Sequence, residues 1–173
     1  PKTGRCAVVL PQGVLFRSGK EGEIRRQLVE SDKLEAIITM ASGVFYSTGV
    51  SACILFLNNN KAVSHRDRIC MIDGSGIYTP QRAQNIMTEA DIQTVFDYYT
   101  AYEDVIEKVK IVTIADIREK DYSLAINNYI EKKEQETVPP EEIRRQYFEA
   151  YDEMIEAETR MRELLLKGGY VSE

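Results

Sequence analysis

The sequence predicts an α/β fold with a long helix near its C-terminal end. Short apolar runs bounded by turn residues lie at 6–10, 34–40 and 50–57, which is typical of buried strands. The segment between the first two runs has apolar residues at helical spacing. A charged segment with helical spacing extends from 139 to 167. The order strand, helix, strand is that of a parallel sheet covered by helices.

Composition limits the class of protein. The chain has 173 residues, of which 43% are hydrophobic and 29% are charged. These fractions are typical of a soluble globular protein with one domain, or with one domain and an appendage. The apolar runs are too short to cross a bilayer, and we recognise no signal peptide. Cys6, Cys53 and Cys70 lie far apart in apolar segments, so we expect buried free thiols in a cytoplasmic protein.

The first elements follow from local patterns. The strand from Cys6 to Leu10 is too apolar to have a solvent-exposed face. Ser18 and Glu21 have the spacing of a capping box, which predicts a helix that ends near Glu30. Helical spacing divides its residues into an inner stripe and an outer face. The inner stripe is Ile24, Leu28 and Val29, and the outer face is Arg25, Arg26 and Gln27.

A glycine-bracketed loop and the strand after it form the centre of the sequence. Residues Val50 to Leu57 are almost wholly apolar and predict a strand buried on both faces. Gly43 and Gly49 permit a tight loop that presents Phe45 and Tyr46 between them. Two adjacent aromatic residues at this position either plug a hydrophobic gap or offer a stacking face to a ligand.

The ends of the strands are candidate positions for a site. In open α/β sheets, ligands bind at the carboxyl ends of the strands. Residues 11–14 follow the first predicted strand and residues 41–45 follow the second. We therefore expect these two segments to line the rim of a site.

The next part of the chain predicts further strands and one helix. Ile69 to Asp73 is a short strand, and Gly74-Ser75-Gly76 after it is a turn without the helix that a phosphate-binding loop requires. Thr88 and Asp91 form a capping box for a helix that extends to about Glu103. Lys110 to Ile114 is a strand. Five residues of the helix recur at helical spacing and are expected in the core: Ile92, Val95, Phe96, Tyr99 and Tyr102.

Residue types argue against two classes of site. His65 is the single histidine, and no pair of cysteines accompanies it. We therefore expect no metal site. A Ser-His-Asp hydrolase would depend on this one loop histidine, and the Gly-x-Ser-x-Gly motif is missing.

The C-terminal part reads as a linker and a helix. Residues 131–138 form a polar linker, and Pro139 and Pro140 open a helix that ends at Gly168-Gly169. Its apolar residues alternate every four and three positions, with the alternation broken at Glu158: Tyr147, Tyr151, Met154, Met161 and Leu165. This pattern fits either a coiled-coil seam or a helix packed on its own domain. We expect this seam to bind a protein partner, with self-association as another outcome.

Charge separates the tail from the rest of the chain. From Glu131 onward there are seven basic and twelve acidic side chains, so most of the net charge of −6 lies in the tail. A DNA-binding surface needs cationic side chains, so the tail is expected to contact protein and not DNA. Elsewhere, Arg17 and Lys20 are candidate phosphate contacts or ordinary solvated surface.

Four segments, in order, resemble one protein family. They are residues 4–16 (GRCAVVLPQGVLF), 21–25 (EGEIR), 34–38 (LEAII) and 44–49 (VFYSTG). Together they resemble the C-terminal half of the modification subunit of type I restriction-modification systems, an adenine-N6 DNA methyltransferase. The resemblance extends to about Tyr129, where 121–124 read Asp-Tyr-Ser-Leu and the family usually has Asp-Tyr-Asn-Leu.

The resemblance implies a division of labour. In this family a glycine-rich turn binds S-adenosylmethionine and an Asn-Pro-Pro-Phe tetrapeptide holds the target amine. Neither motif is present, so we expect a fragment that begins after them. Residues 1–130 would cover the later part of a Rossmann-like methyltransferase domain. We expect this fragment alone to bind no donor. The resemblance also implies duplex DNA and the specificity and restriction subunits as partners.

Family roles transfer only to matching residues. The resemblance places Phe45, with Tyr46 as the alternative, against the flipped adenine. The expected rim of the pocket is Pro11, Gln12, Gly43, Thr48 and Gly49. The partner-binding tail would be 139–173. The competing hypothesis is a stand-alone interaction module that acts through its long helix.

Overall fold

The computed structural model describes residues 3–45, 49–82, 84–131 and 139–170. It divides into two compact units, 1–133 and 134–173, which we describe separately. No helix among the described residues is long and apolar enough to cross a membrane.

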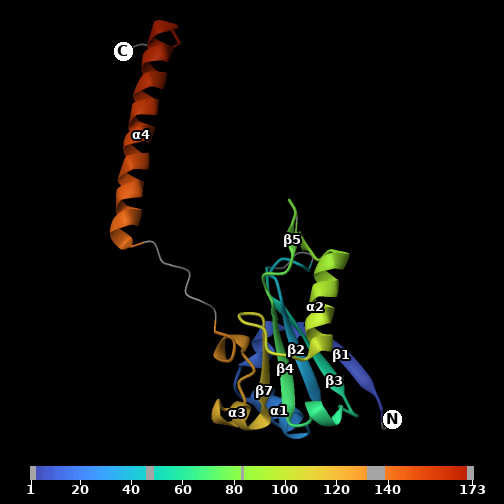
Figure 1. Ribbon diagram of the computed structural model, residues 1–173. Helices are drawn as coiled ribbons and strands as arrows, with labels where there is room; N and C mark the ends of the chain where they lie inside the picture. Colours follow the sequence, from blue (N-terminus) through green and yellow to red (C-terminus); the bar gives the residue numbers. More distant parts are fainter. Residues whose placement is uncertain (1–2, 46–48, 83, 132–138, 171–173) are drawn as a thin grey trace. The chain divides into compact units, whose positions relative to one another are not determined.

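The first unit is built on a five-stranded mixed sheet (Figure 1). The strand order is β1-β3-β2-β4-β7. Only β2 and β4 pair in parallel, whereas β1–β3, β3–β2 and β4–β7 are antiparallel. The strands are β1 (Arg5–Pro11), β2 (Leu34–Met40), β3 (Ala52–Asn58), β4 (Arg68–Gly74) and β7 (Val109–Thr113).

The predicted parallel sheet is therefore wrong in one respect. Strands β1 and β2 run in the same direction, as a strand-helix-strand unit requires, but β3 lies between them and is antiparallel to both. The carboxyl ends of β1, β2 and β4 consequently share one edge of the sheet with the start of β3. The segments 11–14 and 41–45 therefore follow strand ends at the same edge of the sheet, with β3 between them.

Helices cover both faces of the sheet. One face packs against α1 (Lys20–Glu30), α3 (Ile114–Glu119) and the 3-10 turn Ile126–Asn128, around Ile37 and Met71. The other face packs against α2 (Glu89–Ala101), around Ile38 and Ile72. Because Ile37 and Ile38 are adjacent in β2, they point to opposite faces, and both are buried.

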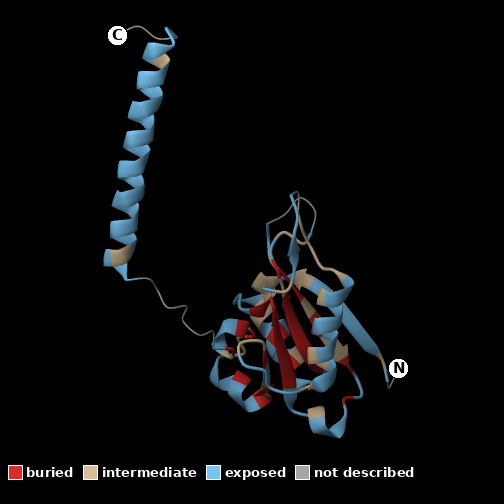
Figure 2. Cartoon of the chain, turned by 45° about the horizontal axis from the view of Figure 1, so that its top comes forward, coloured by how far each residue is buried: buried red, intermediate tan, exposed pale blue. Residues whose placement is uncertain are grey.

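Strand β1 is more exposed than its sequence indicates. It is an edge strand that pairs only with β3, and Figure 2 shows it as mostly exposed. Cys6 is exposed and Val9 is 52% exposed, so the expectation of a fully buried strand and three buried thiols was wrong for this strand. Cys53 and Cys70 are buried in interior strands, and burial raises the pKa of both thiols, that of Cys53 to about 11.

Helix α1 differs from its prediction in cap and inner face. Its N-cap is Gly19, at φ 72°, and no side chain caps it, so Ser18 and Glu21 form no capping box. Ile24 is 65% exposed whereas Arg25 is buried. Rotation of the helix about its axis turns the arginine inward, where its guanidinium donates to three backbone carbonyls, those of Val14, Arg17 and Tyr122.

Helix α2 is capped as predicted but covers less of the sheet than expected. Thr88 and Asp91 form the predicted capping box. Val95 is buried, but Ile92 is 49% and Phe96 is 56% exposed. The helix packs on β4. Ile92 and Phe96 line a pocket together with Ile54 and Phe56 of β3. The expectation that both are core residues was wrong.

The strands β5 (Thr79–Pro80) and β6 (Asn85–Ile86) and the helix α3 have no counterpart in the sequence prediction. Strands β5 and β6 form a short hairpin that projects beyond the end of the sheet (Figure 1). Helix α3 begins directly after β7, where Thr113 and Asp116 form a second capping box.

The second unit contains helix α4 (Pro140–Lys167). Proline occupies the first turn and Gly168-Gly169 end the helix, as predicted. None of its described side chains is buried. The predicted seam is correspondingly open: Tyr147, Tyr151, Met154 and Met161 are 45–62% exposed, and Leu165 is partly buried.

Candidate functional site

An apolar pocket lies beside the loop that carries Phe45. Its volume is about 530 Å³, within the range of small-molecule sites. Its floor is the uncovered part of the sheet, one wall is α2, and the rim comes from the Phe45 loop and the β5–β6 hairpin. The lining includes Val44, Phe45, Ile54, Phe56, Asn85, Ile92, Phe96 and Tyr99.

The loop itself depends on Gly43. This residue has φ 70°, a conformation that costs a side-chain-bearing residue strain. The resulting turn directs Val44 and Phe45 to the pocket after Met40 ends strand β2. Phe45 lines the pocket and yet remains 39% exposed, so part of its ring surface is anchored and part faces solvent.

A buried polar cluster supports the wall of the pocket. The carboxylate of Glu35 in β2 accepts hydrogen bonds from Tyr99 Oη (2.8 Å) and Asn58 Nδ2 (3.1 Å), and His65 Nδ1 lies at 3.3 Å. Burial raises the pKa of Glu35, but these hydrogen bonds outweigh it and hold the pKa below its usual value. Tyr99 in turn stacks on Phe56, with ring centroids 5.2 Å apart. The cluster therefore fixes one aromatic wall of the pocket.

The structure brings together only some of the predicted rim residues. Pro11 pairs with Ala52, and Gln12 N donates to Ser51 O at 3.0 Å, which places both at the same sheet edge as the Phe45 loop. Neither lines the apolar pocket, and Gly49 is exposed after the loop. Tyr46 and Thr48 lie outside the described residues.

The two candidate phosphate contacts lie on a different surface. Arg17 is exposed, packs its guanidinium over Gly13 and is 3.8 Å from Glu21. Lys20 is exposed in the first turn of α1. Their role toward DNA stays a prediction.

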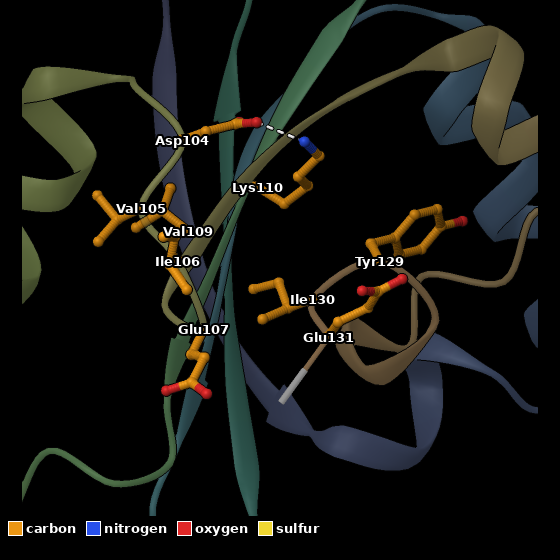
Figure 3. Close-up of a pocket in the computed structure, with 9 residues that line it drawn as sticks. All are labelled: Asp104, Val105, Ile106, Glu107, Val109, Lys110, Tyr129, Ile130 and Glu131. Atoms are coloured by element: carbon orange, nitrogen blue, oxygen red, sulfur yellow. Dashed lines mark hydrogen bonds and ion pairs between the residues drawn. The ribbon is translucent and has the colours of Figure 1, made fainter. Parts of the chain in front are cut away.

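A second pocket of about 550 Å³ lies near the end of the first unit (Figure 3). It is lined by residues 104–107, 109–110 and 129–131. Asp104 forms an ion pair with Lys110 of β7. Burial raises the pKa of Asp104, but the hydrogen bonds from Lys110 and Ile111 N lower it below its usual value. Asp104 and Lys110 therefore satisfy one another on one side of this pocket.

The turn after β4 does not have the form expected of a donor-binding turn. A donor cradle of the expected kind needs a glycine-rich turn that leads from a strand into a helix. The glycine-rich turn after β4 leads instead to the β5–β6 hairpin, and the carboxylate of Asp73 accepts from Ser75 N (3.0 Å) and Thr39 Oγ1 (3.1 Å). The described ranges also contain no cluster of His, Cys, Asp and Glu arranged to hold a metal ion.

Sequence reasoning missed several pocket residues. Ile92 and Phe96 were assigned to the core because helical spacing does not say how much sheet a helix covers. Asn85 was overlooked because its hairpin strands have two residues each, too few for a period-2 pattern.

Comparison with known proteins gives a consistent family. The N-6 DNA Methylase family matches residues 1–138. The chain is 32% identical over 162 residues to the type I restriction enzyme MjaVII methylase subunit of Methanocaldococcus jannaschii, covering 87% of this chain and 28% of that protein. It is 27% identical over 163 residues to the MpnII methylase subunit of Mycoplasma pneumoniae, covering 94% and 30%.

Solved structures agree with these relatives. The type I restriction-modification system methyltransferase subunit from Streptococcus thermophilus has a TM-score of 0.69 at 32% identity, covering 74% of this chain and 27% of that one. The EcoKI M protein has a TM-score of 0.57 at 19% identity, covering 99% and 42%, which supports the fold alone. The resemblance noted in the sequence is confirmed, and this chain belongs to the N-6 DNA methylase family.

Proposed function

We propose that this chain forms one wall of the target-base site in an adenine-N6 DNA methyltransferase subunit of a type I restriction-modification system, and that Phe45 stacks on the flipped adenine. The chain spans 28% of the MjaVII relative, so the reaction belongs to a longer parent protein. The sheet described above would be the later part of its Rossmann-like domain.

The chemistry requires such a wall. An adenine amine is inaccessible inside a duplex, so the base must leave the stack, at a cost of a few kcal/mol. Stacking on an aromatic side chain contributes roughly 1–3 kcal/mol per base. An aromatic residue at the site therefore offsets part of the cost of extrusion.

The observation that carries the proposal is the position of Phe45. A stacking platform needs one part of the ring held by protein and another part free. Phe45 meets both conditions, because it lines the apolar pocket and is 39% exposed at the edge where β1, β2 and β4 end. In open α/β sheets that edge is where ligands bind.

The remaining chemistry is assigned to the rest of the parent protein. S-adenosylmethionine supplies the methyl group when bound, and the described residues here do not fit it. This chain's own contribution is to hold the base and to exclude water from one side of it.

The proposal is tested by Phe45→Ala and Phe45→Tyr in the full-length methylase subunit within its complex. Phe45→Ala should lower methylation of duplex DNA by about tenfold, as expected for the loss of one stacked ring. Phe45→Tyr keeps the ring and should retain most of the activity. A large drop in melting temperature for Phe45→Ala, with little loss of activity at permissive temperature, would instead favour the alternative that Phe45 plugs a hydrophobic gap.

Helix α4 is proposed as the surface that binds the specificity subunit. Its exposed apolar seam fits a helical partner, and its acidic side chains disfavour direct contact with DNA. Duplex DNA and the restriction subunit would join through the assembled complex. The relatives are type I methylase subunits, which argues against the stand-alone interaction module.

A further inference from the structure

The loop that carries Phe45 is held by one residue from the β5–β6 hairpin. Asn85 donates twice to it: its backbone N–H to Gly43 O at 2.9 Å and its side-chain Nδ2 to Ser42 O at 2.8 Å. Two successive carbonyls of the loop are thereby fixed by a single side chain and its own backbone. The second bond ends three residues before Phe45.

The backbone of the loop is shaped for this contact. At φ 70°, Gly43 places its own carbonyl and that of Ser42 toward the hairpin. A Cβ added at Gly43 would lie 3.5 Å from Asn85 Nδ2, so the two residues are in close contact. The loop and the hairpin therefore fit each other at this point.

Asn85 is linked to helix α2 through the hairpin. It pairs with Pro80 across the hairpin, and the next pair is Thr79 with Ile86. Thr79 Oγ1 lies 3.5 Å from Asp91 Oδ2, the carboxylate of the α2 capping box. The hairpin thus connects the start of α2 to the Phe45 loop (Figure 1).

We infer that Asn85 is a positioning residue for the base-stacking ring of Phe45. This inference rests on the proposed function, since Asn85 acts on the base only through Phe45. An aromatic platform contributes to transition-state binding only if its orientation is fixed before the base arrives. Both residues line the same pocket, and the two hydrogen bonds set the loop relative to it.

The first arm of the test follows the loop without any reaction. The chain has no tryptophan, so Phe45→Trp introduces a single fluorescent reporter. Asn85→Asp is isosteric but replaces the Nδ2 donor with an oxygen that faces Ser42 O. It should raise acrylamide quenching and lower the fluorescence anisotropy of Trp at 45. Asn128→Asp is the matched control, since Asn128 Nδ2 donates to Ser123 Oγ in the distant 3-10 turn.

The second arm measures methylation by the full-length subunit in its complex. Asn85→Asp and Asn85→Ala should each lower kcat/KM on duplex DNA by about tenfold or less, the size of one hydrogen bond. The effect should vanish in a Phe45→Ala background, because the residue then has no ring to position. Asn128→Asp should match the wild type.

The outcomes separate the two proposals. Unchanged quenching in Asn85→Asp overturns the positioning role, whatever the activity. Equal activity losses with and without the Phe45 ring also overturn it. If both Asn85 variants unfold the chain, Asn85 is a residue of the fold and the inference fails. If quenching rises in Asn85→Asp but Phe45→Ala methylates normally, Asn85 does position the loop. Base stacking by Phe45, the proposed function, is then wrong.

Discussion

Glu35 is the clearest case in which one buried charge organises neighbouring elements. It lies in β2 and is 4% exposed, while its partners come from β3, the turn before β4, and α2. A buried carboxylate is tolerated only when its lone pairs are satisfied, and here Tyr99, Asn58 and His65 supply the partners. Burial, and after it the hydrogen bond to Glu35, raise the pKa of Tyr99 to about 12.

This arrangement predicts a pH dependence. Because the pKa of Glu35 is lower in the folded than in the unfolded chain, its stabilisation is present above the ordinary value of 4.5 and is lost as pH falls through the folded pKa. Glu35→Gln should cost about 2 kcal/mol at pH 7. Urea unfolding from pH 7 to pH 3 should show the difference in free energy of unfolding between wild type and Glu35→Gln narrowing below pH 4.5. Glu103→Gln, at an exposed position, serves as control. A stability difference between Glu35→Gln and wild type that stays constant with pH would refute the stabilising role of the Glu35 carboxylate.

Arg25 shows a limit of sequence reasoning at the residue scale. Its charge assigned it to the outer face of α1, yet it is 8% exposed and serves as a hydrogen-bond donor to three loop carbonyls. Those carbonyls come from segments up to 97 residues away in sequence. A helical pattern contains no information on such distant acceptors.

At the scale of elements, caps were predictable where local and tertiary structure agree. Thr88 with Asp91 forms the predicted capping box of α2. Ser18 with Glu21 has the same kind of spacing, but Gly19 at φ 72° starts α1 one residue later. Arg25 donates to the carbonyls of Val14 and Arg17 in the segment before α1, a tertiary contact that a motif of four residues does not contain.

The different N-termini of α1 and α2 predict different losses of stability. Thr88→Ala should lower the free energy of unfolding by about 1 kcal/mol, because it removes the side-chain acceptor at the N-cap. Ser18→Ala should change it by less than about 0.5 kcal/mol, as for an ordinary surface substitution. Urea titration of both variants makes the comparison. Equal destabilisation would show that Ser18 caps α1 in solution.

The exposed seam of α4 predicts assembly. Met154→Asp with Met161→Asp should abolish co-purification of the full-length methylase subunit with its specificity subunit, because charge enters an apolar interface. Donor binding should survive. Thr159→Asp is the control, since five residues along a helix place it about 140° from Met154. Intact assembly of the double variant would contradict a partner-binding role.

For the whole molecule, the sequence predicted the strands and helices better than their arrangement. The bounds of β2 and α4 agree with the apolar runs and with Pro140 and Gly168. The insertion of β3 between β1 and β2 was not predicted, because pairing partners depend on contacts distant in sequence. The exposure of the α2 residues that line the pocket was not predicted either, because it also depends on contacts distant in sequence. The place of Phe45 beside a pocket could be anticipated, since flanking glycines and an aromatic residue at a strand end are local signals, while its role toward a base stays a proposal.

The division of labour predicts the behaviour of the isolated chain. Calorimetric titration with S-adenosylmethionine should give no measurable heat of binding, because the described residues contain no strand-to-helix glycine turn that fits the donor. The full-length subunit titrated in parallel is the positive control. Stoichiometric binding at low micromolar concentration by this chain alone would contradict the assignment.

The most direct test of base stacking compares two DNA substrates. Phe45→Ala in the full-length complex is assayed on a matched duplex and on one with the target adenine in a mismatch, where extrusion costs less. The stacking role predicts that kcat/KM falls about tenfold on the matched duplex and clearly less on the mismatch. An equal fall on both substrates, accompanied by a lower melting temperature, would contradict it and identify Phe45 as a plug of the apolar pocket.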